Sequence, residues 1–243
     1  MKDFIKYSII GISCIVCAII IGNAVTYVFK SQHTISVTGL GEENFTSDLI
    51  VWSASISTES ESQQQGYAAI AEAQKKVAAY LRQCGIPDDE VTFNFVNVSK
   101  RYQGIYNNDG NWMGQRMIGY TLTQEFVVKS NDVEKVEKAS REISKLIADG
   151  VDLDIMSPEY YCTNLDSIKL ELIEKASADA YQRAQKIAEN GGARLGKATT
   201  ARLGVFQITS STGEEEYSYG GTFNTYSKDK KGRITVRAEY LIK

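Results

Sequence analysis

The sequence holds few residues that could carry out chemistry together. Its one histidine, His33, comes shortly after an apolar N-terminal segment, and Cys84 and Cys162 are the only cysteines beyond that segment. A zinc site or a Ser-His-Asp triad requires histidine or cysteine side chains gathered within the fold. We therefore predict no catalytic, metal-binding or cofactor-binding residue and no cofactor, and we expect His33 to be a solvated linker residue.

Carboxylates are numerous, but their spacing names no known site. Asp149, Asp152 and Asp154 fall where a helix is expected to turn into a strand, without the full ligand spacing of a calcium loop. The run 214–216, three glutamates, is typical of a solvated face. A two-carboxylate hydrolase site is assembled in space and leaves no motif, so a hydrolase of envelope material stays an alternative function.

Gly39, Leu40 and Gly41 resemble the beginning of a dinucleotide-binding loop. Asn44 stands where that motif has its third glycine, and a strand rather than a helix is expected to follow. We therefore interpret Gly39 and Gly41 as glycines that break a strand at a turn.

Two polar segments rich in glycine and asparagine carry clustered aromatic residues. Aromatic side chains exposed on such segments favour contact with a protein partner. The alternative is that they fold back onto their own domain, and the sequence leaves both open. The residues are Tyr102, Tyr106 and Trp112 in one segment, and Tyr217, Tyr219, Phe223 and Tyr226 in the other.

Length and charge limit the class of protein. The chain has 243 residues, a formal net charge of −3 and 43% hydrophobic residues. That is enough for one large domain or two small ones with a true core. The acidic balance lacks the basic footprint of a nucleic-acid partner, so we predict none.

Residues 7–29 contain no charged side chain and follow Lys2 and Lys6. At about 1.5 Å per helical residue, this segment is long enough to cross a hydrocarbon core of about 30 Å. We predict an uncleaved signal anchor over residues 1–30 that spans the cytoplasmic membrane once, with residues 31–243 in the periplasm or outside the cell. A cleaved signal peptide ending near Ala24 is the alternative.

The expected location bears on the two remaining cysteines. An oxidising compartment permits a disulfide between Cys84 and Cys162. The sequence does not show whether their Cα atoms are close enough, so the bridge stays open.

Hydrophobic periodicity predicts an α+β fold, with helices packed on largely antiparallel sheets in two lobes. A bulge is expected near Phe95 and Val96, where the alternation changes phase. Asn131 or Ser130 is expected to cap the second helix, and Pro158 suits an edge strand or a bulge. The expected strands cover 35–44, 48–60, 91–102, 117–129, 151–163, 198–211 and 233–243, and the expected helices 62–85, 130–150 and 165–190.

The third helix carries an alanine every four residues, at Ala176, Ala180, Ala184 and Ala188. Such a stripe is expected to let the helix lie close on a sheet, and Gly191 or Gly192 to end it. The stretch DSIKLELIEKASADAYQRAQKIAENGGARLGKATTARLG resembles the hallmark of the SIMPL domain family, DUF541. Gly39, Gly41 and Asp48 match the opening strand pair of that family, although many members have proline where this chain has Ser47.

The resemblance covers roughly residues 34–243 and implies no catalytic residue. Bacterial members are exported or membrane-anchored, some are linked to oxidative-stress defence, and a related antigen forms a ring-like oligomer; a mammalian relative is a signalling adaptor. We therefore expect a non-enzymatic, envelope-anchored module that self-assembles as a homo-oligomer, with an unidentified protein partner and a link to stress tolerance. A small-ligand binder, with its groove between the two lobes, is the main alternative.

Overall fold

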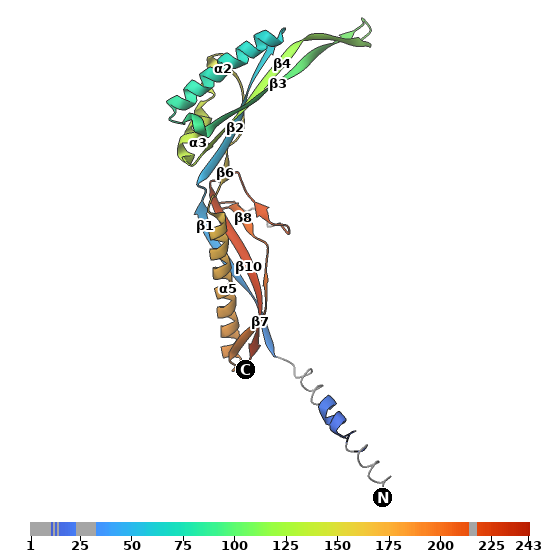
Figure 1. Cartoon of the computed structure of the whole chain (residues 1–243), viewed down its shortest axis with the longest axis vertical. Helices are drawn as coiled ribbons and strands as arrows, with labels where there is room; N and C mark the ends of the chain where they lie inside the picture. The colour runs from blue at the N-terminus through green and yellow to red at the C-terminus, as the bar shows by residue number, and fades with distance from the viewer. Residues whose placement is uncertain (1–10, 12, 14, 23–32, 214–217) are drawn as a thin grey trace. The chain divides into compact units, whose positions relative to one another are not determined.

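The structure is a computed structural model of the chain, and it describes residues 11, 13, 15–22, 33–213 and 218–243 (Figure 1). Within these residues, 15–22 are helical. No helix in the described part of the chain is both long and apolar enough to cross a membrane. The predicted membrane span of residues 7–29 lies for the most part outside the described residues.

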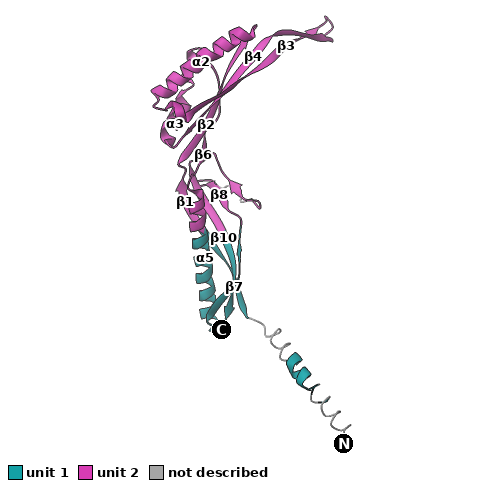
Figure 2. Cartoon of the chain, in the orientation of Figure 1, with its two compact units in different colours: residues 1–41, 173–204, 235–243 teal, residues 42–172, 205–234 magenta. Residues whose placement is uncertain are grey.

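The folded body consists of two compact units (Figure 2). The first unit takes residues 1–41, 173–204 and 235–243, and the second takes residues 42–172 and 205–234. Helices accompany largely antiparallel sheets, which confirms the predicted α+β class.

One five-stranded antiparallel sheet lies in the second unit. Its central strand is β2, Leu49–Ser60, which pairs with β4 on one side and with both β5 and β6 on the other. β3 pairs with β4 and forms the outer strand. The other four strands of this sheet are β3 (Val91–Tyr106), β4 (Trp112–Ser130), β5 (Asp152–Ile155) and β6 (Glu159–Tyr161).

Three helices and a short 3-10 turn accompany this sheet in the second unit, which also takes β8, β9 and parts of β1, α5 and β10. α2 lies beside β2 and β4 (Figure 1) and buries Ile70, Val77 and Leu81 against them. At the middle of the core, the Trp52 ring meets the Phe126 ring edge-on at 5.7 Å, and Trp52 Nε1 donates to the Met156 carbonyl at 3.0 Å. The elements are α2 (Gln63–Gln83), η1 (Asp88–Glu90), α3 (Val133–Glu142) and α4 (Lys145–Ala148).

The other sheet also has five strands, in the order β1-β10-β8-β9, and β7 pairs with β10 as well. Only the pairing of β8 with β9 is parallel among the registers established for this sheet. α5, Leu165–Asn190, has the bounds that the sequence predicts. The strands are β1 (Thr34–Thr46), β7 (Leu195–Leu203), β8 (Gln207–Ser210), β9 (Thr222–Phe223) and β10 (Asp229–Ile242).

The alanine stripe of α5 packs on β1 as predicted. Ala176, Ala180 and Ala184 are fully buried. A Cβ at Gly39 would overlap the backbone of Ala176 and of Ala180, so Gly39 is the position on β1 where the helix comes closest. Gly192, with φ of +72°, ends this segment of the chain in the left-handed region.

The interpretation of Gly39 and Gly41 as strand breakers was wrong. β1 runs through both glycines from Thr34 to Thr46. The reason for Gly39 is space: the facing helix backbone occupies the volume that a side chain would need.

Two local predictions for the second unit concern the bulge in β3 and the N-terminal cap of α3. The register of β3 against β4 shifts between Phe93 and Val96, which confirms the predicted bulge. The cap of α3 was predicted one or two residues too early, because Asp132 accepts the Lys135 N–H at 3.1 Å while the Ser130 hydroxyl accepts the Asp132 N–H. Asn131 instead donates to the Asp48 carbonyl at 2.8 Å.

Several predicted elements are divided in the structure. The expected strand over 151–163 is two short strands, β5 and β6, with Pro158 between them. The expected strand over 198–211 is β7 and β8, interrupted at residues 204–206. The helix expected over 130–150 is likewise α3 followed by α4. Cys84 and Cys162 are free thiols, so the structure contains no bridge between them.

The alanine stripe yields a stability prediction. Ala184→Leu places extra methyl groups in the contact between α5 and β1 and should lower the free energy of unfolding by about 1–3 kcal/mol through overpacking. Urea denaturation followed by circular dichroism measures the change. Ala178→Leu is the matched control, because Ala178 lies on the exposed side of the same helix; equal stability of both variants would contradict the packing described.

Candidate functional site

The residues that the sequence offered for chemistry are spread apart. His33 is exposed just before β1, and its carbonyl accepts the Ile242 N–H at 2.9 Å. Asp152 and Asp154 are exposed on β5, and the Ser57 hydroxyl donates to Asp152 Oδ2 at 2.7 Å. Among the described residues, no group of three or more His, Cys, Asp or Glu side chains is placed to hold a metal ion.

The second aromatic segment is only partly described, since residues 214–217 lie outside the described residues. Tyr219 and Tyr226 are exposed. Phe223, in β9, lies against the Tyr161 ring with 6.4 Å between the centroids. Of the three aromatic side chains described in this segment, Phe223 contacts its own unit and the other two are exposed.

The first aromatic segment forms the far end of the β3–β4 hairpin. Residues 103–115, which fall between the expected strands 91–102 and 117–129 and were expected to form a loop, are mostly strand, because β3 continues to Tyr106 and β4 begins at Trp112. Only residues 107–111 turn, and Asn107 Oδ1 accepts the N–H groups of Asp109 and Asn111 at 3.0 and 2.8 Å. This end of the hairpin extends past α2 (Figure 1).

Cross-strand pairing gathers large apolar side chains on one face of this hairpin. Tyr102 pairs with Met117, and Tyr106 pairs with Trp112. Paired residues lie on the same face of a two-stranded ribbon, and Tyr102 and Tyr106 share a face because β3 has no extra residue between them. The register shifts between Ile105 and Tyr106, where β4 contains one extra residue, Met113. Gly104 lies between the two tyrosines, and a Cβ there would meet the Tyr106 ring. We call Tyr102, Tyr106, Trp112 and Met117 the tip face.

The tip face is open to solvent. Tyr106 is 63% exposed and Trp112 is 65% exposed, so the interpretation in which these aromatics fold back onto their own domain is wrong. The opposite face combines Ile105, which is 46% exposed, with polar groups: Arg116 donates to Gln103 at 3.2 Å, and Arg101 pairs with Glu59 at 2.6 Å. This arrangement can make contacts over an area; it brings no nucleophile and base together.

A second candidate is a groove of about 690 Å³ between α2 and the pair α3–α4 in the second unit. Four lysines line it, and three have partners: Lys76 donates to the Asp149 carbonyl at 2.7 Å, Lys135 pairs with Asp132 at 2.7 Å and Lys145 pairs with Glu142 at 2.8 Å. The fourth is Lys138.

The groove also contains a phenol with a strongly perturbed acidity. Tyr80 donates its hydroxyl to the Ala139 carbonyl at 2.9 Å. Burial, together with a hydrogen bond to Cys84, raises the pKa of Tyr80 well above its ordinary value, so this hydroxyl stays protonated. The Tyr80 proton is already engaged by Ala139, so the lysines are the groups of this groove that suit an anionic ligand, although Glu142 and Asp149 line it as well.

A family model described as SIMPL, a protein of unknown function (DUF541), matches residues 35–239. The chain belongs to the SIMPL family. The match runs from the start of β1 almost to the end of β10, which confirms the resemblance proposed from the sequence. A comparison with curated proteins found no match.

Asp48, one of the residues that carries the SIMPL resemblance, has a structural role. Its carboxylate accepts the Thr163 N–H at 2.7 Å and also the Thr163 hydroxyl, so it fastens the start of β2 to the segment before α5. Burial alone would raise the pKa of Asp48, but the hydrogen bonds from Thr163 outweigh it and lower that pKa below its ordinary value of 3.8.

Sequence reasoning missed two parts of these surfaces. Met117 belongs to the tip face only through its pairing with Tyr102, although the spacing of Tyr102, Gly104 and Tyr106 is a strand signal that could have revealed the ribbon. The lysines of the α2–α3 groove come from helices far apart in the sequence, and no local pattern joins them.

The lowered pKa of Asp48 predicts a pH-dependent effect. Asp48→Asn removes one of two acceptor oxygens and should reduce the free energy of unfolding near pH 7 by about 1 kcal/mol. The contribution of the carboxylate is complete above the pKa of the unfolded chain and is lost as pH falls through the lower folded pKa. The difference between Asp48→Asn and wild type should therefore shrink below about pH 4.

Urea denaturation at a series of pH values tests this expectation. Asp154→Asn is the control, since Asp154 is an exposed strand residue. A difference between Asp48→Asn and wild type that stays constant down to pH 2 would show that the charge of Asp48 has no part in it.

Proposed function

We propose that this SIMPL protein is a non-enzymatic interaction module of the cell envelope. Residues 7–29 hold it in the cytoplasmic membrane, and residues 31–243 lie in the periplasm or outside the cell. The observation that carries the proposal is the tip face, where four large apolar side chains share one exposed face of a two-stranded ribbon.

The chemistry of the tip face supports association with a second copy of the chain. Tyrosine, tryptophan and methionine are enriched at the centres of protein interfaces. Burial of one such side chain contributes about 1.5–3 kcal/mol to the free energy of association. In a symmetric contact between two copies, each tip-face residue is buried once on each copy. The free energy gained by this burial is comparable with the cost of association, about 4–15 kcal/mol. The tip face can therefore support a homo-oligomer.

Membrane attachment would favour the same association. Confinement of residues 7–29 to a bilayer raises the effective concentration of the bodies that follow, and a weak contact then suffices. A role in oxidative-stress tolerance is proposed from the family resemblance alone, and crosslinking in intact cells would identify any protein partner.

The self-association proposal is tested by matched tyrosine variants. Tyr106→Ser should lower the average mass of the fragment of residues 31–243 in light scattering, and the double variant with Trp112→Ser should lower it further. Tyr67→Ser is the control, because Tyr67 on α2 is equally exposed at 62%. A strictly monomeric wild type at every concentration, or an unchanged mass in both variants, would refute assembly through the tip face.

A small-ligand function has one observation in its favour, the four lysines of the α2–α3 groove. We infer from their charge that such a ligand would be an anion, for example a phosphate ester or a polycarboxylate. This groove lies within the second unit, whereas the ligand groove predicted from the sequence was one between the two lobes.

A thermal-shift screen with phosphate and citrate tests the ligand function. An anion that binds only the folded state raises the melting temperature in proportion to the logarithm of its concentration. The rise should be lost in Lys138→Gln and kept in Lys197→Gln, which removes a lysine from the exposed strand β7. No rise with either anion, or an equal rise in both variants, would count against the groove.

A further inference from the structure

β1 is an edge strand with an open side. It pairs with β10 alone in the sheet order, and no other described strand lies next to it. The Ile242 N–H donates to the His33 carbonyl, and the Ser47 N–H donates to the Lys228 carbonyl, both at 2.9 Å. Odd-numbered residues of β1 therefore direct their backbone groups to β10, and even-numbered residues direct theirs to the open edge.

Leu40 confirms this direction, because its N–H donates to Asp179 Oδ2 of α5 at 2.8 Å. A helix side chain thus caps one outward-facing donor of the edge. Among the outward groups nearer the start of β1, those of Ser36 and Thr38 lie beside a groove.

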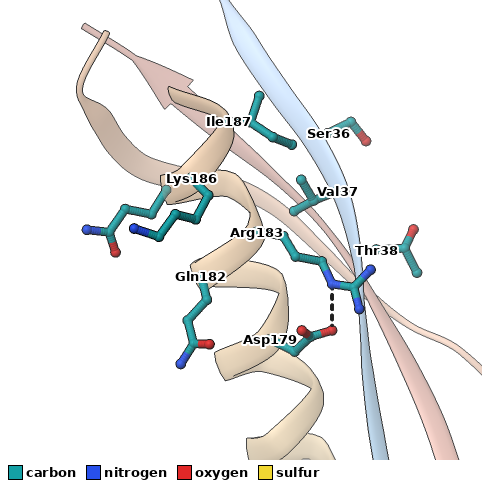
Figure 3. A pocket seen from close by; sticks show the side chains of 9 residues that line it. Ser36, Val37, Thr38, Asp179, Gln182, Arg183, Lys186 and Ile187 are labelled. Atoms are coloured by element: carbon teal, nitrogen blue, oxygen red, sulfur yellow. Dashed lines mark ion pairs between the residues drawn. The ribbon is translucent and has the colours of Figure 1, made fainter. Parts of the chain in front are cut away.

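The groove runs between this stretch of β1 and α5, has a volume of about 790 Å³ and lies within the first unit (Figure 3). Val37 and Ile187 supply its apolar surface. Residues 179, 182, 183 and 186 of α5 follow helical spacing and form one stripe, and Gln185 and Ile187 flank it on either side. The α5 residues that line the groove are thus Asp179, Gln182, Arg183, Gln185, Lys186 and Ile187.

A guanidinium group is held beside the open edge. Arg183 Nε donates to Asp179 Oδ2 at 2.8 Å, and Figure 3 shows the end of the Arg183 side chain directed toward β1 near Thr38. The bond to Arg183 and the one from Leu40 lower the pKa of Asp179, so this anchor stays charged. Because Asp179 engages Nε, the terminal Nη groups of Arg183 are left for other partners, whereas Lys186 pairs with Glu189 at 3.3 Å.

We propose that this groove binds an extended acidic segment of a partner protein, which adds to the sheet as a strand beside β1. The backbone of the segment pairs with the outward N–H and C=O groups of Ser36 and Thr38. Its side chains on the α5 face cover Ile187, which is 52% exposed, and a carboxylate on the segment accepts from the Nη groups of Arg183. This mode of recognition combines main-chain pairing for affinity with side-chain contacts for specificity.

The proposal is independent of the tip face. Its residues all belong to the first unit, whereas the tip face belongs to the second. Variants in one unit therefore leave the other surface intact, and the two proposals can fail separately.

The experiment selects peptides from a random display library on the full-length chain in detergent and measures their binding by fluorescence anisotropy. Selected peptides should be acidic and rich in β-branched residues. Ser36→Pro removes an outward N–H and should weaken binding roughly tenfold or more. Ser36→Ala is the matched control and should bind as wild type does, because it keeps that N–H. Proline is tolerated at edge positions whose N–H faces away from the sheet, and the melting temperature checks the fold.

A second pair of variants tests the charge. Arg183→Gln should weaken the acidic peptide but leave a glutamine-substituted copy of it unchanged, whereas Arg141→Gln, in the second unit, should affect neither. No enrichment of acidic peptides, or full binding by Ser36→Pro, would overturn the proposal. An assembly of the Ser36→Pro variant with a lower mass than that of the wild type would also overturn the proposal, since the occupant of the groove would then be a second copy of the chain.

Discussion

The contact between the α5 backbone and β1 at Gly39 is the constraint on which the first unit depends. A side chain at Gly39 would overlap the backbone at Ala176 and Ala180, and the alanine methyl groups fill the remaining space. Close approach has an electrostatic consequence, because Asp179 can then reach the Leu40 N–H. Asp179 in turn holds Arg183 one helical turn further on. The packing of small residues therefore determines where the charges of the β1 groove lie.

The second unit solves the same packing problem less strictly. α2 meets β4 at Gly66, where an added Cβ would overlap the end of the Leu122 side chain. A side chain can change its rotamer, whereas the backbone that faces Gly39 cannot move aside without displacing the helix. The core here depends instead on large residues such as Trp52 and Phe126, which fill the space between sheet and helices.

Local patterns were sufficient where local physics determines the structure. Alternation identified the buried face of β2, the phase change identified the bulge at Phe93–Val96, and the alanine period identified α5 and the SIMPL family. Tertiary contacts defeated the same reasoning at Gly39, whose cause lies 137 and 141 positions away at Ala176 and Ala180. The tip face was hidden for a related reason, since glycine and asparagine indicate a loop unless the cross-strand pairs are known.

The open edge of β1 has neither lysine nor proline between Thr34 and Thr46. Exposed edges are commonly guarded by lysine, proline or a bulge, because unpaired backbone groups otherwise recruit stray strands. The side chains at Thr34, Ser36 and Thr38 are small and uncharged, and threonine is favourable in strands. A guard is present further along, where Asp179 caps Leu40. The edge of β1 is thus capped at Leu40 and open at Ser36 and Thr38, so an incoming strand can pair at one place only. A requirement for a carboxylate that pairs with Arg183 would exclude strands that lack one.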